Sequence, residues 1–161
     1  SVSAGIATIV MTRATTTTMR RAPLIVLDAS LAIARLRLEE QTPAIIDRFR
    51  DWSIEGARLV VPRPFWWEVA NTLLLRHRQT GAQTLEAVHT LETFRIETRD
   101  LDRGQLLLAI GAVERFRITA YDAQYLVLAE TLACDLATLD KELSRAAGPR
   151  AIAIEGFGPG H

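Results

Sequence analysis

The stretch Leu24-Ile-Val-Leu-Asp-Ala-Ser30 (LIVLDAS) decides the fold class of this 161-residue chain. Its first four residues are all apolar, as expected of a strand that is covered on both faces, and Asp28 stands where the strand gives way to a helix. Further along, short apolar runs alternate with segments of helical period. This alternation is typical of an α/β domain whose mostly parallel sheet is flanked by helices.

The same patterns predict the remaining elements. Strands are expected at 24–28, 58–61, 95–98, 135–139 and 150–154, and helices at 29–38, 43–55, 65–79, 83–94, 102–116, 121–133 and 141–147. Gly81 is expected to end the helix that follows Pro64. One apolar stripe is expected on the helix at 102–116, formed by Leu106, Ile110, Val113 and Phe116.

The chain divides into a Thr-rich leader at 1–22, which we expect to be flexible, one domain at 23–155 and a flexible tail at 156–161. Lys and Arg number 19, as do Asp and Glu, so the formal net charge is zero. A general binder of polyanions carries excess positive charge, and nucleic-acid binding must therefore rest on local arrangement. No apolar run is long enough to span a bilayer, which favours a cytoplasmic location.

Cysteine and histidine offer little chemistry here. The single Cys134 cannot form an internal disulfide, and the three histidines lack zinc-type spacing. His77 and His89 have no acid or serine partner at a catalytic spacing, so no catalytic role is expected for either. The candidate chemistry therefore lies with other residues.

Four carboxylates stand at similar places. Asp28 and Asp140 follow strands, Glu68 borders the apolar face of a helix, and Asp122 belongs to Thr119-Ala-Tyr-Asp122. Each has an ordinary explanation: helix caps for the first pair, a solvated side chain for Glu68, and a capping box for Asp122. Carboxylates that follow strands of one parallel sheet nevertheless meet at one edge, where they repel each other unless a cation compensates.

A divalent metal is the natural compensator for such a group. Mg²⁺ and Mn²⁺ prefer carboxylate oxygens, keep several waters, and bind substrate phosphates. This combination is typical of metal-dependent phosphodiester hydrolysis. Without the four acids and the leader, the body has 15 acids against 16 bases, so the zero net charge does not argue against an RNA substrate.

Four segments together resemble a known family. LIVLDAS (24–30), FWWEVANTL (65–73), TAYDAQYLVLAE (119–130) and LATLDKEL (136–143) are similar to the PIN domains of VapC-type ribonuclease toxins, which belong to type II toxin-antitoxin systems. The resemblance runs from about residue 23 to 154. It implies a three-layer PIN-like fold and a Mg²⁺- or Mn²⁺-dependent endoribonuclease.

The resemblance also implies roles for individual residues. Asp28 and Asp122 would be the principal metal ligands, Glu68 would hold or activate a metal-bound water, and Asp140 would bind a second ion or an outer water. Supporting polar groups would be Ser30, Asn71, Thr119 and Thr138. Candidate RNA contacts are Arg35, Arg37, Arg63, Arg76, Arg78 and Arg145, although solvated helix arginines are the ordinary alternative. A homodimer and a cognate VapB-like antitoxin that masks the site are the implied partners.

Two alternatives stay open at this point. A haloacid-dehalogenase-like phosphatase also begins with a strand that ends in Asp, but Asp28-Ala29-Ser30 lacks the second acid of that family's motif. A non-catalytic PIN-like module, acting through its partner alone, would be favoured by loss of an acid. All four acids are present, which favours an enzyme.

Overall fold

The computed structural model describes residues 21–154, and its centre is a four-stranded, all-parallel sheet. The strand order is β3-β2-β1-β4. The strands are β1 (Leu24–Leu27), β2 (Arg58–Pro62), β3 (Glu97–Arg99) and β4 (Asp135–Ala137). β1 lies in the middle, pairing with β2 through Ile25 and Leu59 and with β4 through Val26 and Leu136.

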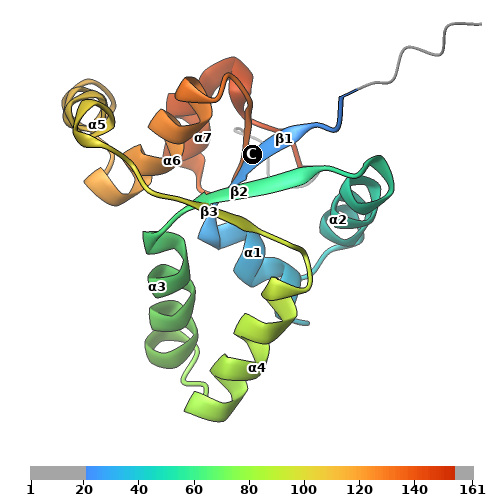
Figure 1. The fold of residues 1–161 in the computed structure, drawn as a ribbon. Helices are drawn as coiled ribbons and strands as arrows, with labels where there is room; N and C mark the ends of the chain where they lie inside the picture. Colours follow the sequence, from blue (N-terminus) through green and yellow to red (C-terminus); the bar gives the residue numbers. More distant parts are fainter. Residues whose placement is uncertain (1–20, 155–161) are drawn as a thin grey trace, which may run out of the picture.

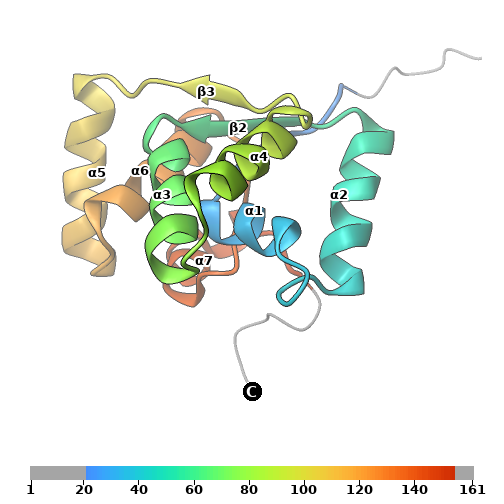
Figure 2. The same cartoon turned by 90° about the horizontal axis from the view of Figure 1, so that it is seen from below.

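Helices cover both faces of the sheet, which makes three layers (Figure 1). On one side lie α5 (Arg103–Phe116), α6 (Ala120–Thr131) and α7 (Lys141–Ala147). On the other lie α1 (Ala29–Leu36), α3 (Pro64–Asn71) and α4 (Gly81–Glu92), with α2 (Pro43–Glu55) beside them (Figure 2). The parallel sheet and its two helical layers confirm the predicted α/β class.

Helix α6 is the centre of the core. It is apolar on nearly all sides and buries six consecutive or near-consecutive residues between Ala123 and Ala129. Its middle turns belong in the protein interior, while Tyr121, Glu130 and Thr131 near its ends are exposed. β1 is buried against it, with Val26 and Leu27 fully inaccessible. The residues that follow β1 and those that begin α6 are therefore held on the rigid part of the fold.

Most predicted elements are confirmed with shifts of a few residues at their ends. The expected strand at 150–154 is wrong: a 3₁₀ turn at Gly148–Arg150 occupies its start, and only Ala151 forms a single parallel bridge, to Leu136 of β4. Gly81 does not end a helix but begins α4, since Thr80 caps that helix in a capping box with Gln83.

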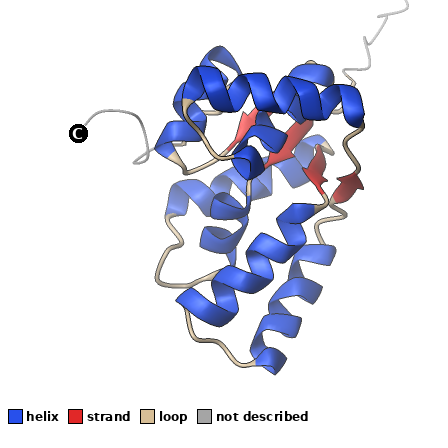
Figure 3. Cartoon of the chain, turned by 90° about the vertical axis from the view of Figure 1, so that its left-hand side faces the viewer, coloured by secondary structure: helices blue, strands red, loops and turns tan. Residues whose placement is uncertain are grey.

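The expected helix at 65–79 is also wrong in its second half. α3 ends at Asn71 and continues as a π-helical turn, η1 (Thr72–Arg76), in which the amide of His77 donates to the carbonyl of Thr72 at 3.1 Å. α3 and α4 together extend away from the sheet (Figure 3). Within residues 21–154, no helix has both the length and the apolar character needed to cross a membrane. The predicted tail at 156–161 and most of the leader at 1–22 lie outside the described residues.

Candidate active site

A cavity of about 540 Å³ lies at the carboxyl edge of the sheet, and all four candidate acids line it. Asp28 directly follows β1, Asp140 follows β4, and Glu68 belongs to α3, which begins just after β2. Asp122 comes from the first turn of α6. The parallel topology gathers these strand ends at one edge, as the sequence predicts. We call this space the acid cavity.

Asp28 is the most buried of the four, with 4% of its surface exposed. It occupies the N-cap position of α1 but makes no side-chain capping bond, so the ordinary explanation for it is wrong. Instead its Oδ2 accepts bonds from Ser30 Oγ at 2.6 Å and Thr138 Oγ1 at 2.7 Å. Each hydroxyl has one proton to give, and both protons go to the same oxygen. The two hydroxyls therefore fix the orientation of the Asp28 carboxylate.

The same two hydroxyls also hold the loop after β4. Ser30 Oγ accepts from the amide of Leu139 at 3.0 Å, and Thr138 Oγ1 accepts from the amide of Asp140 at 2.9 Å. Ser30 and Thr138 therefore each contact both the Asp28 carboxylate and the backbone after β4. They join the segment after β1 to the segment that carries Asp140.

Glu68 is half-buried and is held by α6. The phenol of Tyr125 donates to its Oε2 at 2.9 Å. The pKa of Glu68 is raised to about 7, mainly by burial. The Tyr125 bond acts to lower this pKa, and the negative charges of Asp28 and Asp122 add to the rise. Glu68 is therefore not a solvated helix glutamate. It is a carboxyl that exchanges its proton near neutral pH.

Asp122 and Asp140 differ in how their carboxylates are used. The expected capping box at α6 is only half formed: Thr119 Oγ1 accepts from the amide of Asp122 at 3.1 Å, but the reciprocal bond seen in α4 and α5 is missing. The Asp122 carboxylate lines the cavity beside the Thr119 hydroxyl, which lowers its pKa against the larger effect of burial. Asp140 does cap α7, with its Oδ1 accepting from the amide of Leu143 at 2.8 Å, and it lines the cavity as well.

No cation compensates these charges within residues 21–154, since none of the four acids makes an ion pair there. Burial raises the pKa of Asp28, and the charge of Asp140 adds to this. Burial likewise raises the pKa of Asp122, followed by the charges of Asp28 and Asp140. The carboxylates thus act on each other through a partly dehydrated space. A bound cation would offset both the burial of these carboxylates and the repulsion between them.

The donor set fits a hydrated divalent cation better than a fully dehydrated one. Within residues 21–154, no three His, Cys, Asp or Glu side chains are arranged to hold a metal ion directly as they stand. Yet the cavity is lined by four acids from four elements, and Mg²⁺ keeps several waters and needs few protein ligands. Waters would bridge the remaining space to the carboxylates.

Among the remaining predicted polar groups, Asn71 lines the acid cavity. Thr119 instead serves as the N-cap of α6.

The six candidate arginines differ in their surroundings. Arg35 packs between aromatic rings, with its guanidinium carbon 5.9 Å from the ring centre of Phe49 and 5.6 Å from that of Phe94. This position does not suit a phosphate contact.

Three other candidate arginines are already engaged with carboxylates: Arg37 with Glu40 at 2.9 Å, Arg63 with Asp100 at 2.6 Å, and Arg145 with Glu142. Arg76 lines the acid cavity, and its side chain makes no hydrogen bond or ion pair within residues 21–154. Arg78 is exposed outside the cavity wall, with a positive φ of 51°. Of the six candidates, Arg76 is the one that the fold brings to the acids.

His77 is a cavity residue that the sequence did not single out. Its Nε2 lies 3.5 Å from Oε1 of Glu40, and both residues line the acid cavity. The sequence has no acid at a catalytic spacing from His77, but the fold brings Glu40 beside it. Glu40 is far from His77 in sequence, and the π-helical turn that orients His77 has no marker in the residue pattern, so sequence spacing offered no signal.

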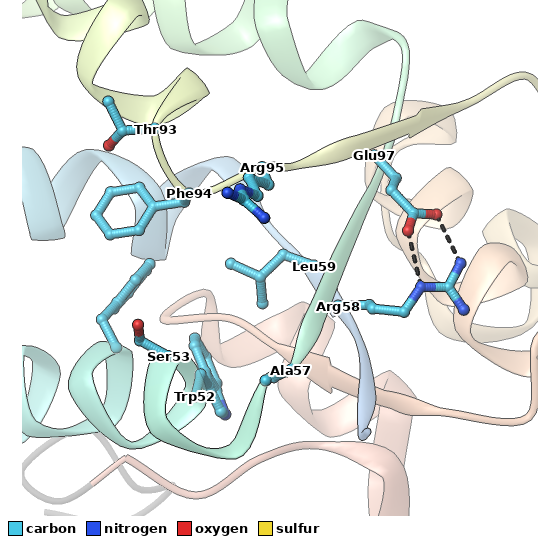
Figure 4. Close-up of a pocket in the computed structure, with 11 residues that line it drawn as sticks. Trp52, Ser53, Ala57, Arg58, Leu59, Thr93, Phe94, Arg95 and Glu97 are labelled. Carbon is cyan, nitrogen blue, oxygen red and sulfur yellow. Dashed lines mark hydrogen bonds and ion pairs between the residues drawn. The ribbon is translucent and has the colours of Figure 1, made fainter. Parts of the chain in front are cut away.

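A larger cavity, of about 640 Å³, opens near the amino end of β2 (Figure 4). Its walls include the aromatic side chains of Trp52 and Phe94. Its one carboxylate, Glu97, is bound by Arg58 through two bonds of 2.8 and 2.9 Å (Figure 4). Without an unpaired acid, this cavity does not offer the chemistry of the acid cavity.

The three-layer fold and the acid cavity place this chain among the α/β proteins that carry an acidic site at the carboxyl edge of a parallel sheet. The model of the PIN domain family matches residues 25–149, and the chain therefore belongs to the PIN domain family. No curated protein matches the sequence at a significant level.

Solved structures share this fold. The protein PAE2754 of Pyrobaculum aerophilum has 19% identity and a TM-score of 0.62, covering 81% of this chain and 83% of that one. A toxin-antitoxin complex from Klebsiella pneumoniae has 15% identity and a TM-score of 0.60, covering 80% and 96%. Mycobacterium tuberculosis VapC20, a toxin that cleaves the sarcin-ricin loop, has 13% identity and a TM-score of 0.60, covering 76% and 94%. At these identities the likeness concerns the fold.

Proposed function

We propose that this protein is a Mg²⁺- or Mn²⁺-dependent endoribonuclease and the toxin of a VapBC-type toxin-antitoxin pair. The observation that carries the proposal is one cavity lined by four carboxylates from four elements, none of which has a cationic partner within residues 21–154. Membership of the PIN domain family supports it. The toxin and toxin-antitoxin structures with the same fold support the choice of biological role.

Each acid has a distinct part in the proposed mechanism. Asp28 and Asp122 would hold the ion, and Asp140 would hold a second ion or an outer water. When bound, the ion polarises the phosphate and makes water a better nucleophile. Glu68 accepts the proton of the attacking water, because its pKa of about 7 suits proton exchange at neutral pH. Tyr125 keeps the Glu68 carboxylate in place.

The substrate we propose is a single-stranded region of RNA. Arg76 offers an unpaired guanidinium to a phosphate beside the acids. Trp67, on the helix that carries Glu68, is 75% exposed and is available to stack on an unpaired base. Trp66 is not, since it packs on Phe65 and donates to Thr98 Oγ1 at 2.9 Å. An RNA substrate agrees with a cytoplasmic location.

Two protein partners belong to the proposal. A VapB-like antitoxin would cover the acid cavity and keep the enzyme inactive. A second copy of the chain would pack on α5, where the predicted apolar stripe is only partly used in the core. Leu106 and Ile110 are each 56% exposed, and together with Leu101 and Ala109 they line a hollow of about 340 Å³. An exposed apolar surface of this kind marks an interface.

The experiment that tests the enzyme is cleavage of a mixed RNA pool by the purified protein with Mg²⁺ or Mn²⁺. EDTA and the variant Asp28→Asn are the controls, and each should abolish cleavage. Glu55→Gln, a change at the exposed end of α2, is a control for the effect of mutation itself and should leave cleavage intact. Cleavage that persists in both EDTA and Asp28→Asn would overturn the metal mechanism.

The biological role has its own test. Expression of the chain should arrest growth, and coexpression of the small reading frame next to its gene should restore it. Asp28→Asn should not arrest growth. A protein that arrests growth equally well as Asp28→Asn, and cleaves no RNA, would instead be a non-catalytic PIN-like module.

A further inference from the structure

One stretch of the acid-cavity wall carries a cation, Arg76, together with His77 and Glu40. Arg76 and His77 come from the end of the π-helical turn, and Glu40 comes from the loop after α1. Glu40 is also bound by Arg37 at 2.9 Å. Arg37, Glu40 and Arg76 sum to a formal charge of +1, against −4 for the four acids.

The π-helical turn is what brings His77 to this wall. In an uninterrupted α-helix His77 would lie about 180° from Glu68, since nine residues at about 100° each amount to two and a half turns. The i→i+5 bond between the amide of His77 and the carbonyl of Thr72 widens the turn, and both Glu68 and His77 line the cavity. Such turns are rare and occur frequently at functional sites.

His77 is held rather than loose. Its side chain is 14% exposed, and its Nε2 lies 3.5 Å from Glu40 Oε1. Arg37 orients that carboxylate through a 2.9 Å bond from its Nε to the same oxygen. Glu40, held by Arg37, therefore faces Nε2 of the imidazole in the wall that also carries Arg76, and Nδ1 is the ring nitrogen left for a ligand.

We propose that Arg76 and His77 form a phosphate subsite that binds the RNA phosphate next to the one being cut, with Glu40 as the positioning residue for His77. This inference rests on the ribonuclease function proposed above. A strand of RNA repeats its phosphates once per nucleotide, so a strand with one phosphate at the acids presents the next one to the neighbouring wall. An unpaired guanidinium is the side chain best suited to receive it.

The test uses a short single-stranded RNA in which one phosphate at a time is replaced by a neutral methylphosphonate. Binding is measured by fluorescence anisotropy with the full chain carrying Asp28→Asn, which prevents cleavage. We expect one position beside the cut site to weaken binding about 10-fold when neutralised, equivalent to about 1.4 kcal/mol. When Arg76→Ala is added, neutralising that phosphate should weaken RNA binding less than 2-fold, because the contact between Arg76 and the phosphate is already lost.

Further variants test the His77 arrangement. The loss of RNA affinity caused by the neutral phosphate should become about 3-fold smaller in His77→Gln and in Glu40→Gln. The variant that combines both changes should bind RNA no more weakly than His77→Gln alone. In the cleaving protein these changes should raise KM and leave kcat within about 3-fold. Arg78→Ala, which removes an equal charge two residues from Arg76, should weaken binding without changing which phosphate matters. Thermal melting of each variant shows that it is folded.

The outcomes separate the two proposals. If the protein neither binds nor cleaves RNA, the proposed ribonuclease function fails and the subsite with it. If the protein cleaves RNA but neutral phosphates have the same effects with and without Arg76→Ala, the subsite is overturned while the ribonuclease stands. If Arg76→Ala removes the position effect but His77→Gln and Glu40→Gln do not, the assignment of His77 and Glu40 is overturned.

Discussion

The phenol of Tyr125 donates a 2.9 Å hydrogen bond to Oε2 of Glu68, joining the buried helix α6 to the wall of the acid cavity. Burial raises the pKa of Tyr125 far above its usual value, and the charges of Asp28 and Glu68 add to this, so the phenol stays protonated and can donate to Glu68. The bond lowers the pKa of Glu68 against the larger effect of burial.

Tyr125→Phe should move the acid limb of the pH-rate profile for RNA cleavage to higher pH. Without the phenol, the pKa of Glu68 rises above about 7, so less of its basic form is present at a given pH. The variant should also lose about 1–2 kcal/mol of unfolding free energy, because a partly buried carboxyl oxygen is left without its donor. Urea unfolding measures this loss. Tyr121→Phe, on an exposed tyrosine of the same helix, is the matched control; a shift of equal size there would contradict the assignment.

Glu68→Gln should stabilise the metal-free protein at neutral and alkaline pH. The folded-state pKa of Glu68 is about 7 against 4.5 for an ordinary glutamate, so between these values the folded state binds more protons than the unfolded state. The unfolding free energy of the native protein therefore falls as pH rises from about 4.5 to about 7. In Glu68→Gln this decrease in unfolding free energy should be smaller by about 1–2 kcal/mol. That is less than the whole pKa shift of Glu68 would give, because the half-buried side chain is partly screened by solvent.

Thermal or urea unfolding from pH 4.5 to 8.5, in EDTA, measures the effect. Glu114→Gln, which removes an exposed glutamate on α5, should leave the pH dependence unchanged. Parallel curves for the native protein and Glu68→Gln would show that Glu68 is not desolvated as described.

Thr138→Val should weaken the response to divalent cations. The change removes the bond to Asp28 Oδ2 and the acceptor for the amide of Asp140, while the side-chain volume is nearly kept. A cation that binds only the folded state raises the unfolding free energy by about 2.7 kcal/mol at 100 times its Kd. Mg²⁺ or Mn²⁺ should therefore raise the Tm of the native protein and raise that of Thr138→Val much less. Thr138→Ser, which keeps the hydroxyl, should restore the response; equal shifts for Val and Ser would count against this role.

Ile110→Glu should convert the protein to a monomer in sedimentation equilibrium. Ile110 is 56% exposed on α5, so the monomer itself has little to lose from the charge, whereas a buried interface between two copies would not accept it. Lys141→Glu, at the exposed start of α7, is the control and should leave the assembly unchanged. A native protein that is already monomeric at micromolar concentration would overturn the proposed homodimer.

The helices best predicted from sequence are those with strong end signals. α2 was bounded correctly because Thr42 caps it, Pro43 starts it and Gly56 ends it in a left-handed conformation. α7 was bounded correctly between Asp140 and Gly148 for similar reasons. The strand at 150–154 failed because apolar alternation does not reveal that only Ala151 reaches β4.

The candidate site was predictable as a set of residue types but not as an arrangement. Strand-end positions brought Asp28 and Asp140 to one edge, as parallel topology requires. The bond that holds Glu68 by Tyr125 depends on side-chain packing between α3 and α6, which residue spacing does not encode. The pairing of His77 with Glu40 depends in addition on the π-helical turn, for which the sequence has no marker.

Helix α6, which is buried on nearly all sides, supplies both Asp122 and Tyr125 to the acid cavity. Changes to its interior residues therefore disturb stability and chemistry together. When cells are made to express the active protein, the proposed growth arrest selects for chains that have lost it. We expect the missense mutations of surviving colonies to concentrate in the codons of this one helix, well beyond the four acidic positions themselves.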